Sequence, residues 1–404
     1  MCAGRVQKPT RWEYGELAIL FFLHGMAMAM WFVPLSPVLE AHGLGSLRPL
    51  AYATAAVAAF VAPLLFGAMA DRHAGPVRVL RWLALATAVA MALASTAIRQ
   101  GWHPGVVLAL VQLHALCSSP TWSLSSTIVL GRLTEARRQF GPLRATATLG
   151  WMSGCWVVSA LGADTSTLAG YGGAVAWLVL AGFSFMLPAV APPPVEGALT
   201  LGQRLGLDAL VLLRHPDHRV VFITAALFSV PLAAFYPFTP PQLRDLGLEH
   251  TAAWMTLGQV TEILAMFGLA GLLTNWRLKT IIAVGLGFGF LRYALCALDG
   301  RGWVLSGVVL HGFAFTLFFI TAQIYLDERV EAAWRARAQA LMSLMSGGVG
   351  NLAGYLGTGA WFAACAREGG RNWSLFWGGL AVAVAAVLAY FLVAYRGRPA
   401  GART

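Results

Sequence analysis

Pro192-Pro193-Pro194-Val195-Glu196 begins a polar stretch that continues through Gln203-Arg204 and ends with Arg214-His215-Pro216-Asp217-His218. This stretch, 192–218, is the longest one poor in apolar runs, and it lies almost halfway along the 404 residues. Apolar runs of bilayer length lie on both sides of it. We therefore expect a cytoplasmic linker between two sets of membrane helices.

Twelve apolar runs flank this linker, each of about 20 residues, the length that a helix needs to cross a bilayer. Only 11% of the residues are charged and 58% are hydrophobic, whereas a soluble domain has about 25% charged residues. We expect an all-α membrane protein with twelve transmembrane helices in two six-helix bundles, 1–191 and 219–404. The runs are 15–39, 48–70, 77–98, 104–130, 145–162, 167–191, 219–241, 251–273, 280–298, 303–325, 338–364 and 373–394.

The Lys and Arg residues are unevenly distributed around these runs. If the N-terminus is cytoplasmic, twenty of the 28 fall in cytoplasmic segments, and cytoplasmic loops are enriched in positive charge. The net charge of +11 therefore needs no nucleic-acid partner. Both termini are expected in the cytoplasm, and no cleavable signal peptide is expected before the first run, because residues 1–13 are polar and basic. The outer loops hold Arg48, Arg99, Arg244, Arg301, Arg367 and Arg371.

Glu262 is the one carboxylate placed deep inside an apolar run. A charged side chain at the centre of a membrane helix costs about 2.5–3.5 kcal/mol, so it indicates a functional site. Gln259 lies one turn earlier and within about 60° of Glu262 around the helix axis. We expect this pair to handle the substrate and the proton.

A second polar group, Arg144, Thr148 and Trp151, begins the run 145–162. The spacing of i, i+4 and i+7 places the three side chains on one stripe of a helix. A guanidinium, a hydroxyl and an indole offer charge, hydrogen bonding and stacking to a ligand. The alternative is that Arg144 is one more basic residue at a cytoplasmic helix end.

The loop between the second and third runs carries Gly67, Asp71, Arg72, Gly75 and Arg78. Its spacing resembles the G-x-x-x-D-R-x-G-x-x-x-R loop of the major facilitator superfamily, with one extra residue before the second glycine. Asp71 with Arg72 or Arg78 can form a charge-assisted latch between helix ends.

Four motifs together resemble the nucleoside:proton symporter family within that superfamily. They are Arg144-x-x-x-Thr148-x-x-Trp151, Gly258-Gln259-Val260-Thr261-Glu262, Leu291-Arg292-Tyr293, and Leu310-His311-Gly312 followed by Phe315 and Phe319. The resemblance implies proton-coupled uptake of a nucleoside, or a similar hydroxylated ring-containing molecule, by alternating access. It places the protein as a monomer in the cytoplasmic membrane of a bacterium. It also implies that Glu262 couples the proton and that the pocket is lined by Arg144, Thr148, Trp151, Gln259, Glu262, Phe315 and Phe319.

The chain departs from this family at positions that contact nucleosides. The family has a glutamine and an asparagine in its seventh span, but residues 229–236 contain no amide. Thr316 replaces an aspartate, and Phe315 replaces a tyrosine. Lost hydrogen-bonding groups alter substrate discrimination strongly, so the exact substrate does not follow from the resemblance.

Two other classes of function stay open. A proton-coupled drug or metabolite efflux antiporter also suits an aromatic pocket with one acid. A membrane-bound enzyme or a transport-inactive sensor lacks support, because the sequence shows no nucleophile–base pair and no nucleotide motif. No cofactor, metal or disulfide framework is expected, because none of the five cysteines has CxxC or Cys/His spacing: Cys2, Cys117, Cys155, Cys296 and Cys365.

Three further polar residues have two interpretations each. His24 and His311 could relay protons, but a neutral histidine that donates to a helix carbonyl is the commoner case. Arg292 lies toward the outer end of the run 280–298. We expect it to reach the membrane surface as an anchor rather than to contact a ligand.

Overall fold

The protein was analysed as a computed structural model that describes residues 10–70, 75–134, 136–187, 200, 202, 207–268, 276–331, 334–367 and 370–397. The regular secondary structure of the described part is helical except for one short hairpin, β1 (Ala366–Arg367) paired with β2 (Gly370–Arg371). Contacts between Cα atoms divide the chain into two compact units. Unit 1 comprises Met1–Leu47 and Val61–Ala198, and unit 2 comprises Arg48–Phe60 and Leu199–Thr404.

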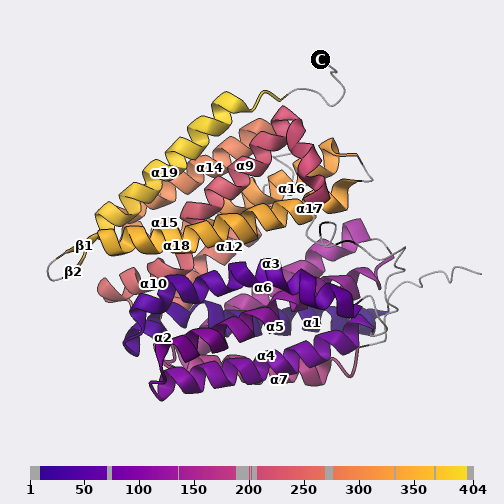
Figure 1. Cartoon of the computed structure of the whole chain (residues 1–404), viewed down its shortest axis with the longest axis vertical. Coiled ribbons are helices and arrows are strands. Elements are labelled where there is room, and N and C mark those ends of the chain that lie inside the picture. The colour runs from indigo at the N-terminus through magenta and orange to yellow at the C-terminus, as the bar shows by residue number, and fades with distance from the viewer. Residues whose placement is uncertain are drawn as a thin grey trace, which may run out of the picture. The chain divides into compact units, whose positions relative to one another are not determined.

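Unit 1 is drawn in indigo and purple in Figure 1. Helix α3 (Arg48–Ala70) contributes its second part to this unit and its first part to unit 2. Within unit 1, α1 packs against α6 and α7, and α4 packs against α5 and α7. The other elements are α1 (Arg11–Phe32), α2 (Leu35–Ala41), η1 (Gly45–Leu47), α4 (Pro76–Arg99), α5 (Pro104–Leu130), α6 (Ala136–Ala160) and α7 (Leu168–Phe183).

Apart from the first part of α3, unit 2 is drawn from rose to yellow in Figure 1. Helix α14 packs against α15 and α19, and α12 packs against α15. Its elements are η2 (Leu207–Arg214), α9 (Pro216–Leu232), α10 (Phe235–Asp245), α11 (Thr251–Met255), α12 (Leu257–Gly268), α14 (Leu278–Cys296), α15 (Arg301–Phe315), η3 (Thr316–Ile320), α16 (Thr321–Arg329), α17 (Arg335–Ser343), η5 (Leu344–Gly350), α18 (Asn351–Ala364) and α19 (Trp373–Ala394).

Each of the twelve predicted apolar runs overlaps a helix in the described part of the chain, but the described residues do not establish twelve spans. Seven helical segments in this part of the chain are long and apolar enough to cross a membrane. The sequence places the start of one helix too late: α6 begins at Ala136, so Pro142 lies inside it. The seven segments are Arg11–Ala41, Pro76–Arg99, Pro104–Leu130, Pro216–Asp245, Leu278–Cys296, Arg301–Arg329 and Trp373–Ala394.

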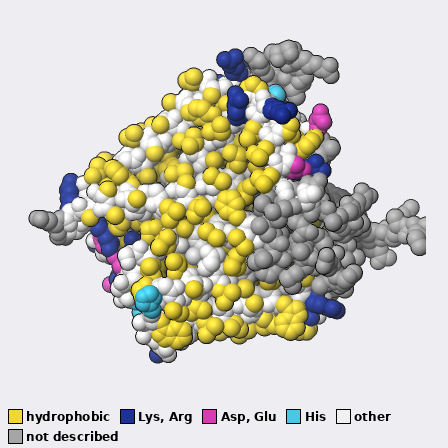
Figure 2. Space-filling view, viewed as in Figure 1, with side chains coloured by type: hydrophobic (Ala, Val, Ile, Leu, Met, Phe, Trp, Pro, Cys, Tyr) yellow, Lys and Arg dark blue, Asp and Glu magenta, His cyan; other side chains and the backbone are white. Residues whose placement is uncertain are grey.

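The surface suits a lipid environment. Figure 2 shows a face on which hydrophobic side chains predominate, with Lys and Arg side chains toward its margins. Val382 and Val393 of α19 are 69% and 84% exposed, and Trp82 of α4 is 65% exposed. A soluble protein rarely exposes large contiguous apolar patches, so these side chains are expected to face lipid.

Helices within unit 1 approach closely through glycine. Gly25 of α1 lies against the backbone carbonyl of Ala147 in α6, and Gly150 of α6 lies against that of Phe22 in α1. A Cβ atom at either glycine would collide with the facing backbone. Small residues allow this close packing of membrane helices, and it fixes the face that α6 presents to α1.

A break between α9 and α10 shapes unit 2 near the predicted site. Pro231 and Pro237 lack an N–H group, so neither can donate to the carbonyl four residues earlier, and the helix is interrupted between Leu232 and Phe235. The hydroxyl of Tyr293 in α14 donates to the Pro231 carbonyl at 2.6 Å. This bond connects the end of α9, where the break begins, to α14.

Gly312 of α15 offers a test of the packing in unit 2. A Cβ atom there would meet the backbone of α12 at Gly258 and Glu262. We expect Gly312→Ala to push α12 away from α15, destabilise the protein by about 1–3 kcal/mol and lower its thermal unfolding midpoint in detergent. Gly302→Ala in the same helix is the control, because nothing lies within 4 Å of its added Cβ. Equal midpoints for the two variants would contradict this packing.

Candidate functional site

Arg144 lies in α6, two turns beyond the start of the helix. Its side chain is half-buried, and its guanidinium carbon lies 4.1 Å from the ring centroid of Trp122 in α5. A guanidinium stacked over an indole is attracted by the ring and loses freedom to move. Arg144 is therefore held against a neighbouring helix instead of standing at a helix end.

The other two residues of the predicted stripe lie on the same helix. Thr148 is buried, and the ring of Trp151 lies 6.1 Å from that of Phe32 in α1, measured between centroids. The α1-facing glycine Gly150 is on an adjacent face of α6. The packing of α6 on α1 thus orients the stripe.

His24 of α1 connects to the same neighbourhood through Trp122, whose ring centroid is 5.1 Å away. Its Nε2 lies 3.0 Å from the Thr121 hydroxyl, and its Nδ1 lies 3.2 Å from the Ser125 hydroxyl. Since Thr121 donates its proton to the Ser118 carbonyl at 2.5 Å, Nε2–H of His24 donates to Thr121. The partners of both ring nitrogens are therefore hydroxyls, and not the helix carbonyl that was expected.

The acid–amide pair lies on α12 in unit 2. Gln259 is 4% exposed, and its Nε2 donates to the hydroxyl of Tyr236 at 3.1 Å. The Oε1 atom of Gln259 is buried and has no hydrogen-bond partner in the described part of the chain. Glu262 is half-buried, and Gly312 lies against its backbone nitrogen.

Phe315 and Phe319 lie where α15 passes into η3, a π-helical turn. Their ring centroids are 5.1 Å apart, and Phe319 stacks on Phe228 of α9 at 6.0 Å. π-Helical turns inside α-helices frequently occur at functional sites. Thr316, which begins this turn, is buried, and its hydroxyl lacks a hydrogen-bond partner among the described residues.

Arg292 and His311 form a buried pair in unit 2. Arg292 is 1% exposed, its Nη1 lies 2.5 Å from Nδ1 of His311, and its guanidinium lies 4.4 Å from the ring of Phe235. The expectation that Arg292 reaches the membrane surface is wrong, because this imidazole and this ring hold it inside. Arginine only donates hydrogen bonds, so Nδ1 accepts and cannot carry a proton. His311 is therefore neutral, and it accepts a side-chain bond instead of donating to a carbonyl.

A double-variant cycle of Arg292 and His311 tests whether the two side chains stabilise the protein as a pair. His311→Leu removes the acceptor from a buried guanidinium and should destabilise the protein by about 1–3 kcal/mol. Adding Arg292→Met to that variant removes the stranded charge, so we expect part of the stability to return. The thermal unfolding midpoints of the two single variants and the double variant measure this. A double variant less stable than His311→Leu alone would exclude the pairing.

The predicted latch falls largely outside the described residues, which omit Asp71 and Arg72. Arg78 is described and is exposed in the first turn of α4. The latch stays a prediction. In the described part, no group of three His, Cys, Asp or Glu side chains could hold a metal ion, and the four cysteines there are free.

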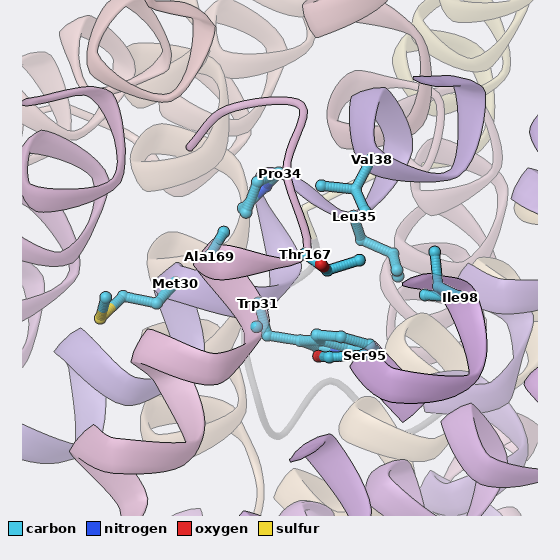
Figure 3. A pocket seen from close by; sticks show the side chains of 10 residues that line it. Met30, Trp31, Pro34, Leu35, Val38, Ser95, Ile98, Thr167 and Ala169 are labelled. Atoms are coloured by element: carbon cyan, nitrogen blue, oxygen red, sulfur yellow. The ribbon is translucent and has the colours of Figure 1, made fainter. Parts of the chain in front are cut away.

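A small cavity in unit 1 lies apart from all the predicted site residues. Figure 3 shows that its lining is mainly apolar, with Ser95 and Thr167 as its polar side chains. Trp31 and Leu35 line it from the region where α1 passes into α2. The cavity contains no charged group, so nothing connects it with substrate or proton.

Two residues outside the predicted site residues take part in the site's geometry. Trp122 stacks under Arg144, and Tyr236 binds the amide of Gln259. A signal exists for Trp122, which lies among hydroxyl residues within an apolar run, from Ser118 to Ser126. Tyr236 belongs to an aromatic set, Phe228, Phe235, Tyr236 and Phe238, which is a weak signal because packing explains any single member equally well.

Comparison with known proteins decides the family. The model of a family described as nucleoside H+ symporters matches residues 14–399. The chain belongs to the nucleoside H+ symporter family. It is 30% identical to YegT of Escherichia coli (strain K12), over 94% of this chain and 93% of the relative. Xanthosine permease of the same organism is 25% identical, over 90% of this chain and 91% of the relative.

Solved structures support the same fold for this symporter. The crystal structure of the nucleoside transporter NupG superposes with a TM-score of 0.84, at 22% identity, over 95% of this chain and 99% of that one. The peptide transporter PepTSo, of the POT family, superposes with a TM-score of 0.73 at 16% identity, over 97% and 99%. The symporter is thus a helical multi-pass membrane transporter.

The predicted site residues of the symporter are shared between its two units. Unit 1 holds the stripe Arg144, Thr148 and Trp151, and unit 2 holds Gln259, Glu262, Phe315 and Phe319. Their convergence on one pocket stays a prediction.

Proposed function

We propose that this symporter takes up a nucleoside together with a proton by alternating access, as a monomer in the bacterial cytoplasmic membrane. Two six-helix bundles, 1–191 and 219–404, are proposed to move about the linker 192–218, with both termini cytoplasmic. The observation that carries this proposal is the match to the nucleoside H+ symporter family over residues 14–399. The names of xanthosine permease and NupG support the nucleoside as substrate.

The proton is assigned to Glu262. It is the one carboxylate deep inside an apolar run, and it lies one turn from the buried amide of Gln259. His311 is unsuited to the task because a proton on Nδ1 would place a second cation 2.5 Å from the Arg292 guanidinium. Protonation of Glu262 is proposed to permit the empty site to reorient, which links the two fluxes.

The substrate is assigned to polar groups of both units. Arg144 and Thr148 would supply a cation and a hydroxyl, and Gln259 would supply an amide. Phe315 and Phe319 would supply aromatic surface for a base, since planar rings stack favourably. The proposed role is transport and not catalysis, with no cofactor.

Uptake into membrane vesicles tests the proposal. Right-side-out vesicles with an alkaline interior should accumulate labelled uridine or xanthosine above the external concentration, and a protonophore should abolish this accumulation. Vesicles without the protein give the background. Extrusion of preloaded nucleoside under the same gradient would instead support an antiporter. Failure of both nucleosides to move would show that the substrate is wrong.

A further inference from the structure

Only one of the two polar atoms in the side-chain amide of Gln259 makes a hydrogen bond in the described part of the chain. Its Nε2 donates to Tyr236 at 3.1 Å, whereas its Oε1 is buried without a partner in the described residues. A buried polar atom without a hydrogen bond is unfavourable, and most such atoms in native proteins have one. An unpaired acceptor at a proposed binding residue indicates that a donor on the substrate completes it.

Tyr236 is well placed to hold this amide in one orientation. It follows the α9–α10 break, and its ring lies 4.9 Å from that of Phe235, between centroids. Phe235 stacks on His311 at 4.0 Å, and Arg292 bonds to His311. Because these contacts link α10, α14 and α15, the tyrosine is fixed on three helices and its hydroxyl has little freedom to shift.

The surroundings favour a planar donor. The rings of Phe235, Tyr236 and His311 lie together, and Phe315 lies 6.1 Å from His311 between centroids. Aromatic side chains suit a nucleobase better than a sugar, because a base offers a flat face for stacking. The donor to Oε1 is therefore assigned to the base rather than to a ribose hydroxyl.

We propose that Tyr236 is a specificity-determining residue, which orients Gln259 so that its Oε1 accepts a hydrogen bond from a ring N–H of the substrate base. This inference rests on the proposed function. The segment 229–236 has no amide side chain, so the Tyr236 hydroxyl is the group from this segment that is proposed to act on substrate selection, through Gln259. The substrates so selected are nucleosides whose base carries a ring N–H, such as uridine and inosine. A nucleoside methylated at that nitrogen loses the donor and leaves the acceptor unpaired.

The test compares uridine with 3-methyluridine, which differ at this donor. Inhibition of labelled uridine uptake by each compound is measured for the wild type, Tyr236→Phe and Tyr390→Phe. The wild type should prefer uridine by about 10- to 100-fold, because a binding site with an unpaired polar group rejects the ligand that lacks its partner. Tyr236→Phe keeps the ring but frees the amide to rotate, so the preference should fall to about threefold or less.

Tyr390→Phe is the matched control. Tyr390 lies near the C-terminal end of α19, and this variant should keep the wild-type preference. A Tyr236→Phe protein that transports uridine with its preference intact would overturn the proposal. So would a wild type that transports both compounds equally, while the proposed function would stand. A wild type that transports no nucleoside would overturn the proposed function itself.

Discussion

Glu262→Gln should abolish the accumulation of nucleoside against a gradient. Glutamine keeps the shape of the side chain but cannot bind and release a proton, so an imposed pH gradient would no longer drive the substrate. The ratio of internal to external labelled uridine should fall to about one. Exchange of internal for external uridine should stay measurable, because it requires only the loaded site to reorient. Both quantities are read from the same vesicles.

The matched control for this substitution is Glu249→Gln. Glu249 is exposed in the segment before α11, so the same chemical change there should leave accumulation unchanged. If Glu262→Gln still concentrates uridine under a proton gradient alone, the proton passes through another group. The neutral, arginine-bound state of His311 makes that residue a poor substitute.

Arg144→Ala should weaken nucleoside binding by at least about tenfold, the effect of losing one hydrogen bond to a charged group. Arg144→Lys should recover only part of this, because an ammonium cannot stack on Trp122 as a planar guanidinium does. Equilibrium binding of labelled uridine to purified protein in detergent measures the change directly. Binding also separates the loss of a contact from the loss of proton coupling.

Arg99→Ala serves as the control for Arg144. Arg99 is exposed at the end of α4 in the same unit, so its loss should not alter uridine affinity. Unchanged affinity in Arg144→Ala would mean that its contact with Trp122 is structural only. That result would remove the substrate role proposed for Arg144.

The sequence predicts the positions of the helices well, because bilayer-length apolar runs carry a strong signal. It fails where helices begin and break. The apolar run 145–162 begins well after Ala136, the first residue of α6, because the first turns of this helix are polar, and the helix continues past Pro142. The break between α9 and α10 lies inside the apolar run 219–241, so the hydropathy of the sequence does not reveal it.

In the candidate site too, some features could be predicted from the sequence and others could not. Helical spacing is sufficient to place Gln259 and Glu262 on one face and to group Arg144, Thr148 and Trp151. Contacts between helices do not follow from spacing within one helix. The burial of Arg292 beside His311 depends on α14 meeting α15, and the bond from Gln259 to Tyr236 depends on α12 meeting the turn into α10.

The π-helical turn η3 (Thr316–Ile320) sets how α15 and α16 relate to each other. A π turn carries one extra residue, and each residue advances a helix by about 100°. Helix α14 packs against α15, η3 and α16, so the side chains that these three elements present to α14 depend on this insertion. A deletion of a single residue here would rotate all of α16 out of phase with α14.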